Sequence, residues 1–351
     1  MKIRVSKRKW NFALVNAVLI LLTLACLCVY LPIRGTLDSL DAADRWRGTS
    51  KERFAQIACF LPEDSTRAEG EILQLREKLD AAMVEASLEA APEHQLYQDA
   101  YSARGTLTIS SDRGSSEVSA IGVGGNFFLF HPLRLRSGSY ISGDDLMDDR
   151  IVLDEIVAWQ LFGGYDVAGQ TVTISGKPYY VAGVVRREDD FATEKAYLDG
   201  AGIFLSYSAL YSLTEQGITC YEIVLPDPIS GFAMNVMKTN FDVGKGEMVE
   251  NSARYRLKNL WTVIRGFGLR SMRANGVIYP YWENAVRLTE DWLALLLLLM
   301  ILFALCPAFT ALVLIIRLVI RGGREVKTRV PRSVDAAIER RREAAYAQRR
   351  K

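Results

Sequence analysis

The sequence has few of the residue types from which most catalytic sites are built. Its only histidines are His94 and His131, and it contains no G-x-S-x-G nucleophile motif, no H-E-x-x-H zinc motif and no close cysteine pairs with the spacing of a zinc site. His131 lies in the apolar stretch "NFFLFHPLRL", which favours a packed or hydrogen-bonded structural role over a catalytic one. We therefore expect a chain that is not an enzyme and that binds no cofactor or metal ion.

A nucleotide-binding loop is also missing. The stretch "GQTVTISGKP" contains Gly176-Lys177, but it lacks the glycine five positions before Gly176 and the Ser or Thr after the lysine. The acidic stretch "GDDLMDDR" lacks the alternating carboxylates and closing glutamate of a calcium loop, so we interpret it as a solvated turn. ATP hydrolysis by this chain alone is not expected, and neither is a nucleic-acid partner.

What the sequence does have is two long runs without charge. Residues 11–33 and 292–316 contain no charged side chain, and at about 1.5 Å per residue each run is long enough to cross a bilayer as a helix. The rival interpretation of the first run is a cleaved signal peptide. Its apolar part is longer than the roughly 7 to 15 residues of such signals, and no small-x-small cleavage site closes it. The sequence therefore favours two transmembrane helices.

The basic residues predict the orientation of these helices. Residues 1–10 contain five basic residues and no acid, and residues 317–351 contain 12 basic and four acidic residues. Because Lys and Arg are retained on the cytoplasmic side, both termini are predicted to be cytoplasmic in a cell membrane. Residues 34–291, with 26 basic and 37 acidic residues, then form a large extracytoplasmic domain with a net charge of −11.

The pattern within this domain predicts an α+β fold, mainly helical over 34–104 and mainly β-rich over 105–290. Apolar residues recur at helical spacing at Ile72, Leu75, Leu79 and Met83. This pattern favours a helix packed on a sheet, and a coiled-coil surface is the alternative. A short helix is expected over 154–162. Strands are expected over 106–110, 118–123, 202–206 and 221–225, separated by Gly, Pro, Asn and Asp.

"DVAGQTVTISGKPYYVAGVV" indicates a β-hairpin in the same domain. Val172 and Ile174 share one face, and after the turn residues from Ser175 to Pro178 we expect Tyr180, Ala182 and Val184 to resume the alternation. Further along the chain, the aromatic stretch "GVIYPYWENA" lies just before the second uncharged run. We interpret its aromatic side chains as a belt at the level of the lipid headgroups, with a ligand-binding aromatic box as the alternative.

Five cysteines give one further prediction. Cys26, Cys28 and Cys306 lie in the uncharged runs, which leaves Cys59 and Cys220 in a compartment that permits disulfides. A Cys59–Cys220 bridge would close a loop of about 160 residues and contribute roughly 4 to 5 kcal/mol in the chain-entropy model. It requires Cα atoms within about 7 Å of each other, which the sequence alone does not show.

The sequence also resembles a known family. The run "FFLFHPLRLRSGSYISGDDLMDDRIVLDEIVAWQLFGGYDVAGQTVTISGKPYYVAGVV", residues 127–185, resembles the periplasmic core domain of MacB-type ABC transporter permeases, a group that includes FtsX-like and lipoprotein-releasing proteins. The resemblance rests on the order in which these features follow one another. They are an aromatic stretch, a turn with Gly138, a strand and helix over 152–162, Gly169 before the hairpin, and the V-x-G-V-V sequence at 181–185. The resemblance implies a subunit that couples a separate cytoplasmic ATPase to an extracytoplasmic domain.

One departure from this family shapes the expected partners. Its members carry three further spans after the domain, whereas here one uncharged run follows it. The resemblance then implies a split permease with an ABC ATPase and at least one further permease chain, or an accessory subunit. The alternative function is a membrane-anchored binding or sensing protein without an ATPase.

The basic tail from Ser333 indicates a helix that would contact the ATPase or, with fewer assumptions, anionic lipid headgroups. The residues expected to make these contacts are Arg324, Lys327, Arg329, Arg340, Arg341 and Arg342.

Overall fold

The computed structural model describes residues 7–89, 95–143, 145, 147–197, 202–267 and 276–348. Side chains are described within these ranges from Trp10 to Gly322, and at Ile338. His94 therefore lies outside the described residues. The chain divides into two units: residues 31–294, here called the sheet domain, and residues 1–30 with 295–351, here called the helical unit.

Two long helices supply the helical unit, α1 (Lys7–Arg34) and α10 (Tyr281–Gln348). The segments Trp10–Arg34 and Tyr281–Gly322 are long and apolar enough to cross a membrane, as the two uncharged runs predict. Within this unit the Thr310 hydroxyl donates to Oδ1 of Asn16 at 3.1 Å, so a hydrogen bond between polar side chains joins α10 to α1. The six tail residues predicted to contact lipid or the ATPase lie on α10, and their side chains lie outside the described part.

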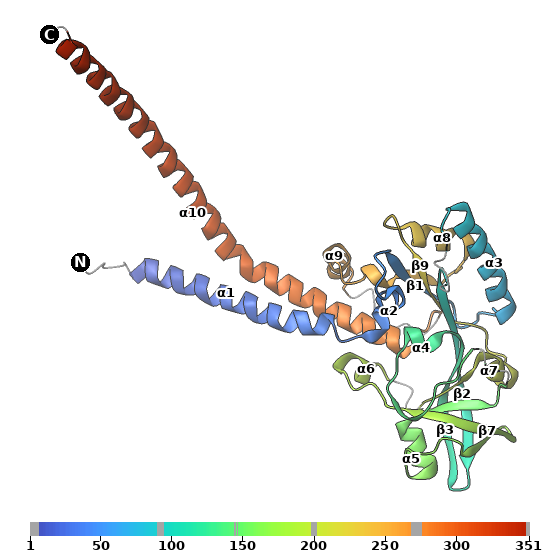
Figure 1. Cartoon of the computed structure of the whole chain (residues 1–351). Coiled ribbons are helices and arrows are strands. Elements are labelled where there is room, and N and C mark those ends of the chain that lie inside the picture. The colour runs from blue at the N-terminus through green and yellow to red at the C-terminus, as the bar shows by residue number, and fades with distance from the viewer. Residues whose placement is uncertain are drawn as a thin grey trace. The chain divides into compact units, whose positions relative to one another are not determined.

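A single ten-stranded mixed sheet organises the sheet domain, in the order β10-β1-β9-β2-β3-β8-β5-β7-β4, with β6 paired to β2 and β7 (Figure 1). The pairs β3–β8 and β5–β7 are parallel, and the other pairs are antiparallel. The strands are β1 (Phe54–Phe60), β2 (Gln98–Ser111), β3 (Gly114–Gly125), β4 (Leu135–Gly138), β5 (Arg150–Asp154), β6 (Thr171–Ile174), β7 (Lys177–Val185), β8 (Gly202–Ser206), β9 (Cys220–Pro226) and β10 (Glu247–Glu250). The mixed fold agrees with the predicted α+β class.

Helices cover both faces of this sheet. The described helical segments of the domain, besides the start of α10, are η1 (Asp38–Leu40), α2 (Ala42–Arg47), α3 (Glu69–Glu85), α4 (Phe127–Phe130), α5 (Glu155–Phe162), α6 (Phe191–Ala196), α7 (Tyr207–Thr214), α8 (Phe232–Asn240), η2 (Asn251–Ala253) and α9 (Leu257–Arg265). The first core layer holds buried side chains of α3, α5, α7 and α8. The second holds those of α2, α4, α6 and the start of α10.

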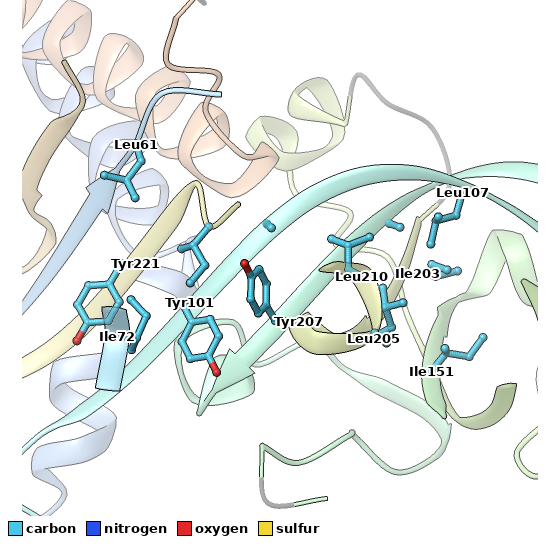
Figure 2. Close-up of a cluster of buried hydrophobic side chains, with 14 of the residues drawn as sticks. Leu61, Ile72, Tyr101, Leu107, Ile151, Ile203, Leu205, Tyr207, Leu210 and Tyr221 are labelled. Carbon is cyan, nitrogen blue, oxygen red and sulfur yellow. The ribbon is translucent and has the colours of Figure 1, made fainter. Parts of the chain in front are cut away.

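The first core layer confirms the predicted amphipathic helix. Within α3 the buried residues are Ile72, Leu75, Leu79 and Met83, and all four belong to this layer. Figure 2 shows part of the layer, with Ile72 near Tyr101 and Tyr221 and with Leu210 among neighbouring aliphatic side chains. The short helix α5 is also as expected, with the Asp154 carboxylate accepting from the backbone N–H of Val157 at its start. Packing on the sheet therefore accounts for the apolar face of α3.

The hairpin has the predicted strands but a different turn and face. Ile174 pairs with Lys177, so the turn is only Ser175-Gly176, and both residues have positive φ. Tyr179 is buried opposite Val172, whereas Tyr180 is 47% exposed, so the expected inward position of Tyr180 is wrong. An irregularity in the β5–β7 register near Ala182 then returns Val184 to the core.

The segment 34–104, predicted to be mainly helical, also contains β1 and the first residues of β2, which the sequence does not indicate. Six of the seven residues of β1 are buried, in the run "FAQIACF". A strand buried on both faces shows no apolar and polar alternation, so its sequence does not distinguish it from a buried helix.

The Cys59–Cys220 bridge is also wrong, because both thiols are free and buried. Cys59 lies opposite Tyr221, and Cys220 lies opposite Phe60. Residues directly opposite each other share a face of the sheet, so Cys59 points into the first core layer and Cys220 into the second. Two side chains on opposite faces of one sheet do not form a disulfide without a change of register.

We predict that both cysteines are recovered as free thiols from protein made in its native compartment. Burial, with Glu222 nearby, raises the pKa of both thiols, so the reactive thiolate is scarce in the folded state. Alkylation should therefore be slow in native protein and complete after unfolding without reductant, as measured by mass spectrometry. An engineered cysteine at the exposed Ser115 should react rapidly in both states. A disulfide-linked Cys59–Cys220 peptide would contradict the β1–β9 register.

Candidate functional site: the buried start of α10

The first turns of α10 are part of the sheet domain. Tyr281, Trp282, Ala285 and Val286 are buried in the second core layer. The predicted headgroup belt is therefore wrong, because these aromatic side chains pack against protein. Phe60 contacts Tyr279 edge to face at 5.3 Å between ring centres. The long helix thus begins inside the domain, about three turns before the uncharged run at 292–316.

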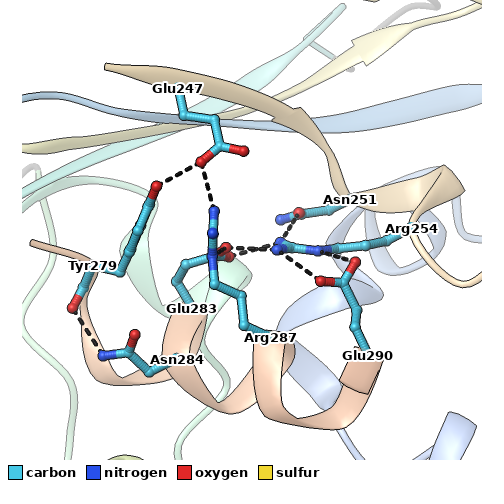
Figure 3. Close-up of polar contacts among 8 residues, drawn as sticks. All are labelled: Glu247, Asn251, Arg254, Tyr279, Glu283, Asn284, Arg287 and Glu290. Carbon is cyan, nitrogen blue, oxygen red and sulfur yellow. Dashed lines mark hydrogen bonds and ion pairs between the residues drawn. The ribbon is translucent and has the colours of Figure 1, made fainter. Parts of the chain in front are cut away.

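A buried arginine holds this start of α10 to the strand and turn before it. Arg254, just after η2, has a side chain that is 3% exposed. Its guanidinium donates to the two oxygens of Glu283 at 2.7 and 2.5 Å, to Glu290 at 2.9 Å and to Oδ1 of Asn251 at 3.0 Å. Figure 3 shows the guanidinium between the two carboxylates of α10. Glu283 and Glu290 lie two helical turns apart, so one cation bridges that length of the helix.

A second arginine extends the same cluster to β10. Arg287 donates through Nε to Glu283 at 2.6 Å and through Nη2 to Glu247 of β10 at 2.7 Å. The Tyr279 hydroxyl donates to the same Glu247 oxygen at 2.6 Å, and the Arg287 guanidinium lies 3.8 Å from the centre of the Tyr279 ring (Figure 3). We call these residues the Arg254 cluster: Glu247, Asn251, Arg254, Tyr279, Glu283, Arg287 and Glu290.

The carboxylates of the cluster keep its arginines charged. Burial alone would lower the pKa of Arg254, but Glu283 and Glu290 raise it above its ordinary value. Burial would likewise lower the pKa of Arg287, and Glu283 and Glu247 raise it. Burial would raise the pKa of Glu247, whereas the Tyr279 hydroxyl and Arg287 lower it. The cluster is thus a set of mutually compensated charges, and removal of Arg254 would take the shared cation from Glu283 and Glu290, of which Glu283 would keep its pair with Arg287.

Aromatic residues and the second histidine complete the packing around Trp282. The His131 ring lies 4.4 Å from the Trp282 ring and 4.6 Å from the Phe127 ring, measured between centres. Its Nε2 is 2.5 Å from a carboxylate oxygen of Glu222 on β9, and both side chains are buried. His131 therefore has the packed, hydrogen-bonded setting that its sequence context indicates.

A cavity of about 70 Å³ lies beside Trp282 in the sheet domain, and its lining includes Phe204, Arg186 and Thr219. The Trp282 indole N–H is buried and finds no hydrogen-bond acceptor among the residues that the structure describes. An unmatched buried donor of this kind would favour a ligand that carries an acceptor.

The site consists of buried charge pairs, packed aromatic side chains and a cavity. No group of three or more potential metal ligands occurs within the described residues. The sequence did not identify the Arg254 cluster, although Glu283, Arg287 and Glu290 recur at spacings of four and three on one helix face just before an uncharged run. The cysteines singled out from the sequence lie outside the cluster.

Comparison with known proteins gives a family match and similar solved structures. The family model described as the MacB-like periplasmic core domain matches residues 48–234, more than half of the chain. The periplasmic region of MacB from Actinobacillus actinomycetemcomitans is similar at 16% identity, over 60% of this chain and 92% of that one, with a TM-score of 0.40. The extracellular domain of the noncanonic ABC-type transporter YknZ from Gram-positive bacteria is similar at 13% identity, over 56% and 99%, with a TM-score of 0.38. No curated protein matches the chain.

We predict that Arg254→Met destabilises the sheet domain by about 3 to 5 kcal/mol, because Glu283 and Glu290 lose their shared cation while buried. Urea denaturation followed by tryptophan fluorescence measures this change. Arg47→Met, which breaks a surface pair with Asp44, is the matched control and should change stability by about 1 kcal/mol or less.

Combining Arg254→Met with Glu283→Gln and Glu290→Gln should recover part of the loss, because the neutral amides need no cation. Equal stabilities of Arg254→Met and Arg47→Met would contradict the cluster's role.

Proposed function

Because the chain belongs to the family of proteins with a MacB-like periplasmic core domain, we propose that it is a permease-like membrane subunit of an ABC-type export or mechanotransmission complex. In this proposal a separate cytoplasmic ATPase moves the membrane helices, and the sheet domain responds on the other side of the membrane. The chain itself supplies no nucleotide-binding loop, so its part is mechanical.

The observation that carries the proposal is the attachment of α10 to the sheet domain. The helix starts among the buried residues of the second core layer, is bonded to Arg254, and continues without interruption as a candidate span to Gly322. A rotation or shift of the span would therefore act on residues 281–291. The sheet would move with them, because separation of α10 from the sheet domain would leave buried charges without their partners. Nucleotide binding at a partner would drive this only by favouring one arrangement of the helices.

The proposal places both termini in the cytoplasm and the sheet domain outside it. Its support is the basic residues at the two chain ends and the net charge of −11 between the runs. Five basic residues precede the first run, and the tail after the second run is basic as well.

Cysteine labelling in intact cells tests this topology. An impermeant maleimide should label a cysteine at Ser115, which is exposed on the sheet domain, and should not label one at Ser333 until the cells are opened. The background variant lacks Cys26, Cys28 and Cys306, and Cys59 and Cys220 remain because they are buried. Labelling of Ser333→Cys in sealed cells, with Ser115→Cys protected, would reverse the assignment.

Partners follow from the same proposal. We propose an ABC ATPase and at least one further permease chain as partners, as expected of a permease-like subunit with a MacB-like periplasmic core domain. The basic residues from Arg324 to Arg342 would contact the ATPase or anionic lipids in the cytoplasmic leaflet.

Gentle extraction from cells that express the native neighbouring genes should co-purify an ABC ATPase and a further membrane chain. Deleting residues 324–351 should weaken ATPase recovery and leave the sheet domain folded, because that domain ends at residue 294. Arg340→Gln, Arg341→Gln and Arg342→Gln together separate the two roles of the tail: loss of the ATPase favours a protein contact, and loss of binding to anionic vesicles alone favours lipid. Full-length protein recovered only as a monomer or homodimer would contradict the assembly.

A membrane-anchored sensor is the second candidate, and the cavity beside Trp282 is the observation that favours it. A ligand bound there would contact the start of α10 directly. A stable homodimer with no ATPase, together with a ligand-dependent change in Trp282 fluorescence, would select this function.

A further inference from the structure

The helix α9 presents apolar side chains that the sheet domain leaves uncovered. Leu260 and Val263 are buried, so one face of α9 is attached to the domain. Leu257 is 65% exposed and Trp261 is 42% exposed, one turn apart on the helix. Phe267, just after the helix, is 45% exposed. Three large apolar side chains within eleven residues thus face away from the core.

The charge of this segment is opposite to that of the domain around it. Residues 255–267 contain three basic residues and no acid, whereas residues 34–291 as a whole have a net charge of −11. Lys258 and Arg265 are exposed on α9, and the Arg265 guanidinium lies 5.8 Å from the centre of the Trp261 ring. The exposed surface of α9 is therefore both apolar and cationic, a combination suited to an interface between lipid and water.

The position of α9 is fixed by the Arg254 cluster. Arg254 lies three residues before the helix and is bonded to Glu290, which is two residues before Trp292, the first residue of the uncharged run. Asn259 and Thr262 of α9 line the same cleft as Glu290. This arrangement places α9 beside the point at which α10 loses its charged residues and would enter the hydrocarbon.

We propose that α9 lies on the outer surface of the membrane and binds anionic phospholipid headgroups. Leu257 and Trp261 insert at the boundary between headgroups and acyl chains, and Lys258 and Arg265 contact lipid phosphates. Two independent features support a membrane rather than a protein: the cationic charge, which complements anionic lipid, and the placement beside the start of the uncharged run. The binding requires no ATPase, and its placement on the outer surface rests on the proposed topology.

Spin-label accessibility tests the proposal in the full chain. Trp261→Cys and Trp159→Cys, each in the background without Cys26, Cys28 and Cys306, are labelled and reconstituted in nanodiscs. Trp159 is 57% exposed on α5 and is the control. Collision with oxygen, which concentrates in lipid, is compared with collision with a water-soluble nickel chelate. The label at 261 should favour oxygen several-fold more than the label at 159, and more strongly in phosphatidylglycerol-rich than in phosphatidylcholine discs.

Charge variants identify the headgroup contacts. Lys258→Glu with Arg265→Glu should abolish the difference between anionic and neutral discs, whereas Lys177→Glu on the β6–β7 hairpin should preserve it. Equal nickel accessibility at 261 and 159 in both kinds of disc would overturn the proposal. So would protection of residue 261 that appears only after a partner chain is added. Oxygen preference without dependence on anionic lipid would overturn the headgroup contacts.

Discussion

Arg254 is the buried charge on which the arrangement of the sheet domain around α10 depends. Its side chain is 3% exposed, and the carboxylates that compensate it, Glu283 and Glu290, both belong to α10. A guanidinium without these partners would leave a buried charge uncompensated, at a cost that exceeds that of most surface contacts by severalfold. The turn after β10 and the first turns of α10 therefore form together or not at all. This constraint turns the start of a candidate membrane helix into an internal element of a folded domain.

The packing around Trp282 strengthens the same connection. The second core layer joins Trp282 to Phe127 of α4 and, through His131, to Glu222 on β9 near the middle of the sheet. Charge pairs resist separation of the helix from β10, and aromatic packing resists its rotation against the sheet. The chain belongs to the family of proteins with a MacB-like periplasmic core domain, and the coupling proposed above would act through this connection.

The sequence predicted features with a clear period or a long uncharged run, and it failed where burial removes that signal. The face of α3 and the two spans follow directly from spacing and length. By contrast, β1 is buried on both faces and shows no alternation, so the sequence does not indicate this strand within 34–104. Elimination pairs Cys59 with Cys220, but the β1–β9 register puts them on opposite faces. Tyr281 and Trp282 precede a span, a position typical of lipid-facing aromatic residues, although they are core residues. Arg254 meets residues that are 29 and 36 positions away, a pairing that no local pattern specifies.

Hydrogen exchange of the full chain in nanodiscs tests most directly whether the start of α10 is a rigid part of the sheet domain. The backbone amides of residues 285–290 should exchange as slowly as those of β9, a strand paired on both sides, because both would open only when the domain unfolds. Arg254→Met should accelerate both sets together. Fast exchange of residues 285–290 while β9 stays protected would mean that α10 frays from the domain independently, and a mechanical connection through the Arg254 cluster would then be excluded.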